Sequence, residues 1–231
     1  MNQAARKPEI ILALDVDTLA RAHAFIDTMS PRVKVFKVGL QLFTQAGPAI
    51  VEYVRKKGAG VFLDLKFHDI PNTVACAVRQ AVRLQVEMMT LHACGGAAML
   101  KAACAAAEEE SEKLKVKKPI LLGVTVLTSQ EAAPGEVLRL ASQSLECGLG
   151  GVVCSVREAA LLRKEIPRQF IIVTPGIRPD AKSADDQKRT ATVAQAVGAG
   201  SDFLVIGRPI LEAADPLKAV DAYLKEIHRQ E

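Results

Sequence analysis

The chain has 231 residues, of which 49% are hydrophobic and 24% are charged, and its formal net charge at pH 7 is +4. This composition is typical of a globular protein and excludes an intrinsically disordered one. The small positive charge comes without a basic run interleaved with aromatic residues, so no nucleic-acid partner is expected.

The cysteines and the apolar runs indicate the cellular compartment of the protein. Five cysteines are scattered through apolar stretches, with neither C-x-x-C spacing nor histidines placed to complete a metal site. Such thiols are expected to stay reduced, as in a cytosol. Asp15 and Asp17 stop the N-terminal apolar run too early for a signal peptide, and no apolar stretch approaches membrane-spanning length. We therefore expect a soluble, cytoplasmic protein that binds no membrane and no metal ion.

Short apolar runs alternate along the chain with segments whose apolar residues recur at helical spacing. The predicted strands are 10–14, 33–38, 61–65, 88–91, 120–127, 151–154, 170–173 and 203–206. The predicted helices are 19–29, 42–56, 73–84, 97–109, 137–147, 158–164, 190–197 and 216–228. Near-continuous apolar strands between amphipathic helices are typical of a parallel sheet covered by helices.

Eight strand–helix units within 231 residues average about 29 residues each, which suits a compact barrel. A doubly wound open sheet is the alternative, but the first strand lacks the G-x-G-x-x-G that often follows it in that fold. We therefore predict an α/β fold, a (β/α)8 TIM barrel, as a single domain spanning residues 1–231.

Polar groups follow nearly every predicted strand. In chain order they are Asp15, Lys37, Lys66, His92, Thr125 with Thr128, Ser155, Arg178 and Gly207-Arg208. The carboxyl ends of the strands form the active face of such a barrel, so these groups should converge on one mouth. This convergence predicts an enzyme.

The densest charged stretch is DLKFHDIPNT, residues 64–73, after the third predicted strand. Residues two apart on a strand share a face, so Asp64 and Lys66 should point the same way. A structural ion pair explains an isolated D-x-K motif. Lys37 in a neighbouring strand, together with Asp15, favours instead an alternating network of acids and bases that keep one another ionised.

Several of the other groups have two interpretations. Asp17-Thr18 is expected to cap the first helix, whereas Asp15 is expected to contact a ligand. Thr128 begins TSQE, which matches a capping box, but its hydroxyl is equally placed to contact a ligand. Ser155 also begins a capping box, and we interpret it as structural. His92 is either a general base or a hydrogen-bonded core group.

The last two units indicate an anion site. Gly207-Arg208 follows a strand, where the glycine permits close approach of the backbone and the arginine offers a forked donor. The long polar segment 174–189 is either a lid that brings Arg178 and Gln187 to a phosphate, or a surface loop without a ligand.

Taken together, these residues resemble the orotidine 5′-phosphate decarboxylase family. The motif D-x-K-x-x-D of Asp64, Lys66 and Asp69 also occurs in related sugar-phosphate decarboxylases and hexulose-phosphate synthases. The whole DLKFHDIPNT string and the PGIRP loop at 175–179 are far more specific. Further similar segments are ALD at 13–15, FKVG at 36–39, VLTS at 126–129, DQ at 186–187 and VIGRP at 205–209.

The resemblance implies a homodimeric barrel that converts orotidine 5′-monophosphate into uridine 5′-monophosphate and carbon dioxide, in pyrimidine biosynthesis, without a metal or organic cofactor. It implies that Lys66 protonates the pyrimidine carbon that loses the carboxylate. Asp64 would lie against the departing carboxylate, with Lys37 in the same charged network. Asp69 and Thr73 would reach into the site of the partner subunit.

The resemblance also implies how the substrate is held. Asp15 would contact the ribose hydroxyls and Thr128 the edge of the pyrimidine. The phosphate would be held by Arg178, Gln187, Gly207 and Arg208. The rival functions are a metal-assisted sugar-phosphate decarboxylase or aldolase, an enzyme with a Schiff-base lysine, and a phosphate-binding barrel whose charged network is purely structural.

Overall fold

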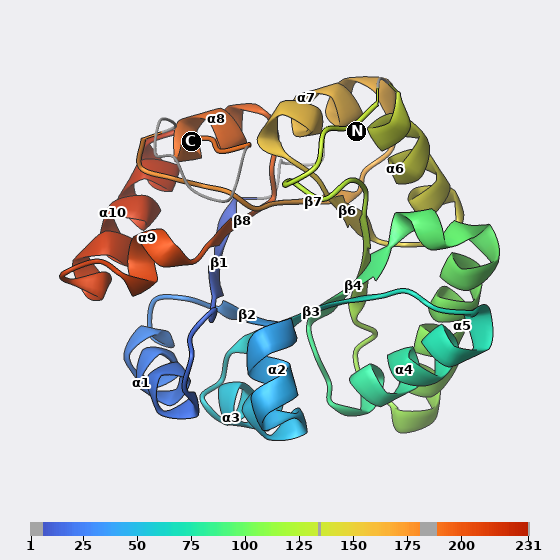
Figure 1. The fold of residues 1–231 in the computed structure, drawn as a ribbon, viewed down its shortest axis with the longest axis horizontal. Coiled ribbons are helices and arrows are strands. Elements are labelled where there is room, and N and C mark those ends of the chain that lie inside the picture. Colours follow the sequence, from blue (N-terminus) through green and yellow to red (C-terminus); the bar gives the residue numbers. More distant parts are fainter. Residues whose placement is uncertain (1–6, 134, 181–188, 231) are drawn as a thin grey trace.

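The computed structural model describes residues 7–133, 135–180 and 189–230. Eight parallel strands close into a barrel in which each strand pairs with the next and β8 pairs with β1 (Figure 1). The strands are β1 (Glu9–Ala13), β2 (Val35–Gly39), β3 (Gly60–Phe67), β4 (Met88–His92), β5 (Ile120–Val124), β6 (Gly151–Val153), β7 (Ile171–Thr174) and β8 (Phe203–Ile206). The predicted (β/α)8 TIM barrel is confirmed.

The helices form a ring around the strands (Figure 1). They are α1 (Leu19–Met29), α2 (Leu40–Ala46), α3 (Pro48–Lys56), α4 (Pro71–Arg83), the 3-10 turn η1 (Ala93–Gly95), α5 (Gly96–Leu114), α6 (Glu136–Glu146), α7 (Val156–Glu165), α8 (Val193–Gly198), α9 (Arg208–Leu211) and α10 (Pro216–Arg229). Within the part of the chain that the structure describes, none of these helices is long and apolar enough to span a bilayer.

The strands are apolar on both faces because each face packs against something. On β1, Leu12 belongs to the layer between the sheet and the helices. Its neighbours Ile11 and Ala13 belong to a separate cluster inside the barrel, with residues of the other strands. Alternate residues of a strand point to opposite faces, so one apolar run supplies both layers.

The predicted helix 42–56 is wrong, because two helices occupy this region. α2 ends at Ala46 and α3 begins at Pro48. Between them, Gly47 has φ 58° and ψ −146°, a conformation that a glycine adopts readily. Pro48 then occupies the first position of α3, where its missing N–H costs no hydrogen bond.

The capping predictions fare differently. Thr18 caps α1 by accepting a hydrogen bond from the Arg21 N–H at 3.3 Å. At α7, the Glu158 carboxylate accepts from the Ser155 N–H at 2.8 Å, which is one of the two bonds of a capping box. The capping box at Thr128 is wrong, because Thr128 lies in a turn and α6 begins only at Glu136.

Candidate active site

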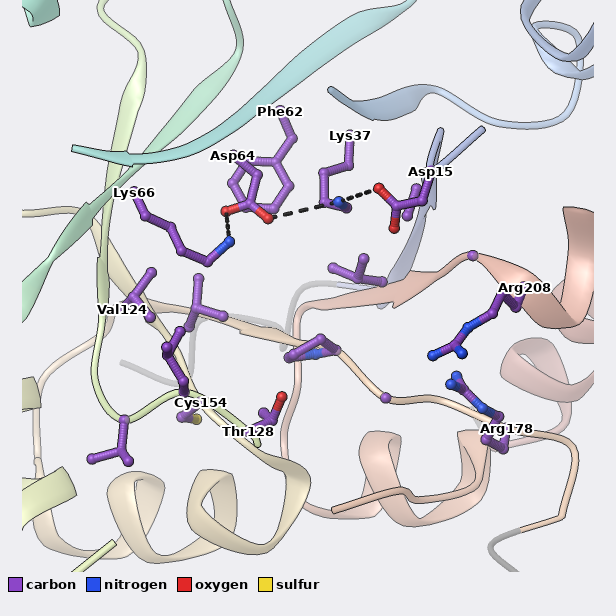
Figure 2. A pocket seen from close by; sticks show the side chains of 18 of the residues that line it. Asp15, Lys37, Phe62, Asp64, Lys66, Val124, Thr128, Cys154, Arg178 and Arg208 are labelled. Atoms are coloured by element: carbon purple, nitrogen blue, oxygen red, sulfur yellow. Dashed lines mark hydrogen bonds and ion pairs between the residues drawn. The ribbon is translucent and has the colours of Figure 1, made fainter. Parts of the chain in front are cut away.

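A cavity of about 490 Å³ lies at the carboxyl ends of the strands (Figure 2). Its volume falls within the range of small-molecule sites. Eight of the predicted site residues line it: Asp15, Lys37, Asp64, Lys66, Thr128, Arg178, Gly207 and Arg208. Gln187 lies outside the described residues.

Four charged side chains cross one wall of the cavity as an alternating series, which Figure 2 shows as dashed lines. The Lys37 Nζ lies 2.8 Å from the Asp15 Oδ1 and 3.7 Å from the Asp64 Oδ2. The Lys66 Nζ in turn lies 2.9 Å from the Asp64 Oδ1. The structure therefore brings together the network of acids and bases that the strand ends predict.

The network lets a largely buried carboxylate stay charged. The Asp64 side chain is only 14% exposed and that of Lys37 11%. Burial by itself raises the pKa of Asp64, but attraction to Lys37 and Lys66, with hydrogen bonds from Lys66 and Thr90, outweighs it. The pKa of Asp64 therefore lies below its ordinary value, and Asp64 is an anion at neutral pH.

The local fold provides room for the Lys37 ammonium. Lys37 points into the cavity from the middle of β2 (Figure 2), and Gly39 follows it two residues later. A Cβ at position 39 would lie 3.0 Å from the Lys37 Nζ and 3.4 Å from the Asp15 Oδ1. Glycine at this position therefore lets the Lys37–Asp15 ion pair form against the backbone.

Two guanidinium groups face each other at the other end of the cavity (Figure 2). Arg208 begins the short helix α9 directly after Gly207. Arg178 follows β7, and only 6% of it is exposed. Two cations placed together at a cavity wall favour an anionic ligand, and the guanidinium fork matches phosphate oxygens.

Residues near the two ends of the long loop after β7 pair with each other next to Arg178. Ile177 and Ala191 form a parallel bridge, and the Arg178 N–H donates to the Ala191 carbonyl at 2.9 Å. Arg189 also reaches across to the loop after β5, where it donates to the carbonyls of Leu127 at 2.9 Å and Thr128 at 3.3 Å. The segment that carries Arg178 and the loop that carries Thr128 are thus joined.

The remaining wall is apolar, and the sequence reasoning missed it. It includes Phe62 inside the barrel, Val124, Val126 and Leu127 around the loop after β5, and Val153, Cys154 and Val205. Burial raises the pKa of the Cys154 thiol, which therefore stays neutral. The sequence signal for this wall was that every second residue of an apolar strand faces the barrel interior. Glu212 also lines the cavity and had no sequence signal.

Five residues expected at the mouth or in the site do not line this cavity among the residues described: Asp69, Thr73, His92, Thr125 and Ser155. Thr125 is buried and its hydroxyl donates to the Val153 carbonyl at 3.1 Å, and Ser155 is buried at the start of α7. Asp69 and Thr73 are exposed on the chain surface beyond β3. His92 packs instead near His68, with the ring centroids 5.5 Å apart. Burial, and then the charges of His68 and Lys66, lower the pKa of His92, so the ring is neutral at pH 7. This position, outside the cavity, disfavours His92 as a general base.

The fold and the site define a (β/α)8-barrel enzyme, with its charged groups gathered at the carboxyl ends of the strands. The family described as orotidine 5′-phosphate decarboxylase / HUMPS matches residues 8–223. The chain belongs to this family, as its motifs predicted.

Individual relatives agree with this assignment. The chain is 47% identical to the orotidine 5′-phosphate decarboxylase of Moorella thermoacetica, over 96% of this chain and 92% of the relative. It is also 47% identical to that of Vibrio cholerae, over 96% and 97%. The crystal structure of orotidine 5′-phosphate decarboxylase from Lactobacillus acidophilus is similar, with a TM-score of 0.82, 34% identity and coverage of 96% of this chain and 99% of that one.

Proposed function

We propose that the chain decarboxylates orotidine 5′-monophosphate to uridine 5′-monophosphate and carbon dioxide, a step of pyrimidine biosynthesis, without a metal or organic cofactor. The observation that carries the proposal is one cavity with the Lys66–Asp64–Lys37–Asp15 network at one end and two arginines at the other. The relatives of that name, at 47% identity over nearly the whole chain, support it.

The chemical step needs a cation at the reacting carbon. When the bond to the carboxylate breaks, carbon dioxide leaves and the electron pair stays on a ring carbon without a conjugated electron sink. The required barrier reduction therefore lies near the top of the ~8–23 kcal/mol range of enzymes. The Lys66 ammonium stabilises the developing charge, and then donates the proton that forms the new C–H bond. Neutral Lys66 regains a proton from solvent.

Asp64 and Lys37 hold that ammonium in place. Because Asp64 stays ionised, it keeps the Lys66 Nζ at hydrogen-bond distance, 2.9 Å from its Oδ1. Lys37 balances the second oxygen of the same carboxylate at 3.7 Å. A charge fixed before the reaction needs no reorganisation when the carbanion forms, and this is the main way in which an enzyme lowers such a barrier.

The other contacts position the substrate. Arg178 and Arg208 would hold the phosphate, together with Gly207 and, as the resemblance implies, Gln187. Asp15, beside Lys37, would contact the ribose hydroxyls, and Thr128 the pyrimidine edge. Binding energy from the phosphate, remote from the reacting carbon, offsets the cost of placing the carboxylate beside Asp64.

We further propose that the active unit is a homodimer with shared sites. Asp69 and Thr73 are exposed next to the catalytic strand rather than turned into their own cavity. Ile70 between them is 67% exposed, which is unusual for a large apolar side chain beside a site and favours a partner surface there. In the dimer, Asp69 and Thr73 would complete the neighbouring site.

The decisive test is the absorbance of orotidine 5′-monophosphate followed with the wild-type chain. We expect it to decay at the same rate with and without a chelator, and borohydride added during turnover should not inactivate the enzyme. Loss of activity with the chelator would favour the metal-assisted rival, and inactivation by borohydride a Schiff-base lysine. A wild-type chain that leaves the absorbance unchanged would refute the proposal.

Shared sites are tested by mixing two inactive variants, Lys66→Ala and Asp69→Ala. Random exchange makes half of the dimers mixed, and each mixed dimer has one intact site of two, so about a quarter of wild-type activity should return. Mixing two different Lys66 variants is the control and should restore nothing. No recovery, despite confirmed subunit exchange, would contradict shared sites.

A further inference from the structure

The pairing of β3 with β4 is irregular at the catalytic lysine. Leu63 pairs with Met89 and Phe67 with Leu91, so the three residues 64–66 lie opposite the single residue Thr90. Within this bulge Lys66 has φ 51°, a left-handed conformation that residues with a Cβ adopt rarely. A bulge next to a site re-aims a side chain, and this one turns Lys66 into the cavity.

A side chain replaces the missing backbone ladder. The Lys66 N–H donates to the Thr90 Oγ1 at 2.9 Å, and the Thr90 hydroxyl donates to the Asp64 Oδ1 at 3.0 Å. A hydroxyl carries one hydrogen, so these two bonds fix its orientation. The same Asp64 oxygen accepts from the Lys66 Nζ at 2.9 Å. Both ends of Lys66 are therefore tied to one carboxylate oxygen, the backbone end through Thr90.

Thr90 has no access to the ligand. It is completely buried, and it is not among the described residues that line the cavity. A hydroxyl at this position must act through the groups that it bonds. The hydroxyl of a buried strand threonine often makes only the one hydrogen bond that offsets its own burial. The Thr90 hydroxyl instead joins the backbone N–H of Lys66 to the carboxylate that holds the Lys66 ammonium.

We propose that Thr90 is a positioning residue for the decarboxylation, and that its hydroxyl sets the left-handed backbone of Lys66 and the orientation of Asp64 together. This role rests on the proposed function, because it concerns the same lysine. Without the hydroxyl, the Lys66 N–H loses its partner and Asp64 loses one of its donors. No hydroxyl then links the Lys66 backbone to the Asp64 carboxylate, while the residues that contact the phosphate and ribose stay in place.

The test compares kcat and KM for orotidine 5′-monophosphate in the wild type and in Thr90→Val, which has the same shape without the hydroxyl. Thr90→Ser and Thr90→Ala form a second pair that differ by one oxygen. Ser144→Ala is the control for loss of a buried hydroxyl, because Ser144 is fully buried on α6 and its hydroxyl donates within that helix, to the Leu140 carbonyl at 2.8 Å.

We expect kcat of Thr90→Val and Thr90→Ala to fall by about 10²-fold, the effect of a small misplacement of a catalytic group, with KM changed only a few-fold. Thr90→Ser should restore most of kcat, and Ser144→Ala should keep the wild-type value. The proposal is overturned if Thr90→Val retains wild-type kcat, if Thr90→Ser is as slow as Thr90→Ala, or if both variants without a hydroxyl fail to fold. An inactive wild-type chain would instead refute the proposed function.

Discussion

Arg189 is expected to stabilise the mouth of the barrel, because it joins the segment after β7 to α7 and to the loop after β5. Its guanidinium contacts the Glu158 carboxylate at the start of α7 and donates to the carbonyls of Leu127 and Thr128. Arg189→Met keeps much of the apolar stem and removes all three bonds. The loop after β5 would then lose its link to the segment after β7.

The size of the effect follows from the burial of the ion pair. The side chains of Arg189 and Glu158 are 15% and 13% exposed, so the charge left on Glu158 would be poorly solvated. Breaking a buried pair costs about 3–5 kcal/mol. Glu158 keeps its bond from the Ser155 N–H, which favours the lower end, about 3 kcal/mol. For a chain of this length that corresponds to a fall in Tm of roughly 6–12 °C.

Urea unfolding measures this difference directly. Arg157→Met is the matched control, because Arg157 is exposed one residue before Glu158 and its loss should change the free energy of unfolding by less than about 0.5 kcal/mol. We also expect Arg189→Met to raise KM, since Thr128 is no longer held. An Arg189→Met chain that unfolds at the same urea concentration as the wild type would refute the reasoning.

Two further predictions concern the two ends of the cavity. Arg208→Ala should weaken binding of uridine 5′-monophosphate by roughly 10–150-fold, the worth of a charged hydrogen bond, and leave uridine binding unchanged; an equal loss for both ligands would contradict the phosphate assignment. The lowered pKa of Asp64 adds stability above its unfolded pKa of about 3.9, and this contribution is lost as the pH falls through the lowered value. Below about pH 4, the wild type should therefore lose unfolding free energy relative to Asp64→Asn, as measured by urea unfolding across pH. If the difference in unfolding free energy between the wild type and Asp64→Asn stayed constant across this pH range, the lowered pKa of Asp64 would be contradicted.

The barrel could be predicted because its signal is local. Each strand supplies one apolar face to the helices and another to the barrel interior, and each helix shows its own period. The predicted end of a strand was wrong where apolar residues continue past the sheet into the wall of the cavity. Val126 and Leu127 extend the apolar run of β5, yet the strand ends at Val124 and these two residues line the cavity. Their apolar character belongs to the site rather than to the sheet.

The charged half of the site could also be predicted, because strand ends of a parallel barrel meet at one face. The parts that depend on register between distant segments could not. The bulge at Lys66 and its bond to Thr90 join residues 24 apart, and the bonds of Arg189 to the loop after β5 join residues 61 and 62 apart. No local spacing encodes such contacts.

The most direct measurement of the central role is the turnover of orotidine 5′-monophosphate by Lys66→Ala, together with its affinity for uridine 5′-monophosphate. Lys164→Ala, whose parent side chain is 82% exposed on α7, is the control and should match the wild type. We predict that Lys66→Ala loses at least ~10⁴-fold in turnover, because electrostatic stabilisation and proton donation are removed together, while the affinity for product changes little. Turnover near the wild-type rate would contradict Lys66 as the group that stabilises and protonates the carbanion.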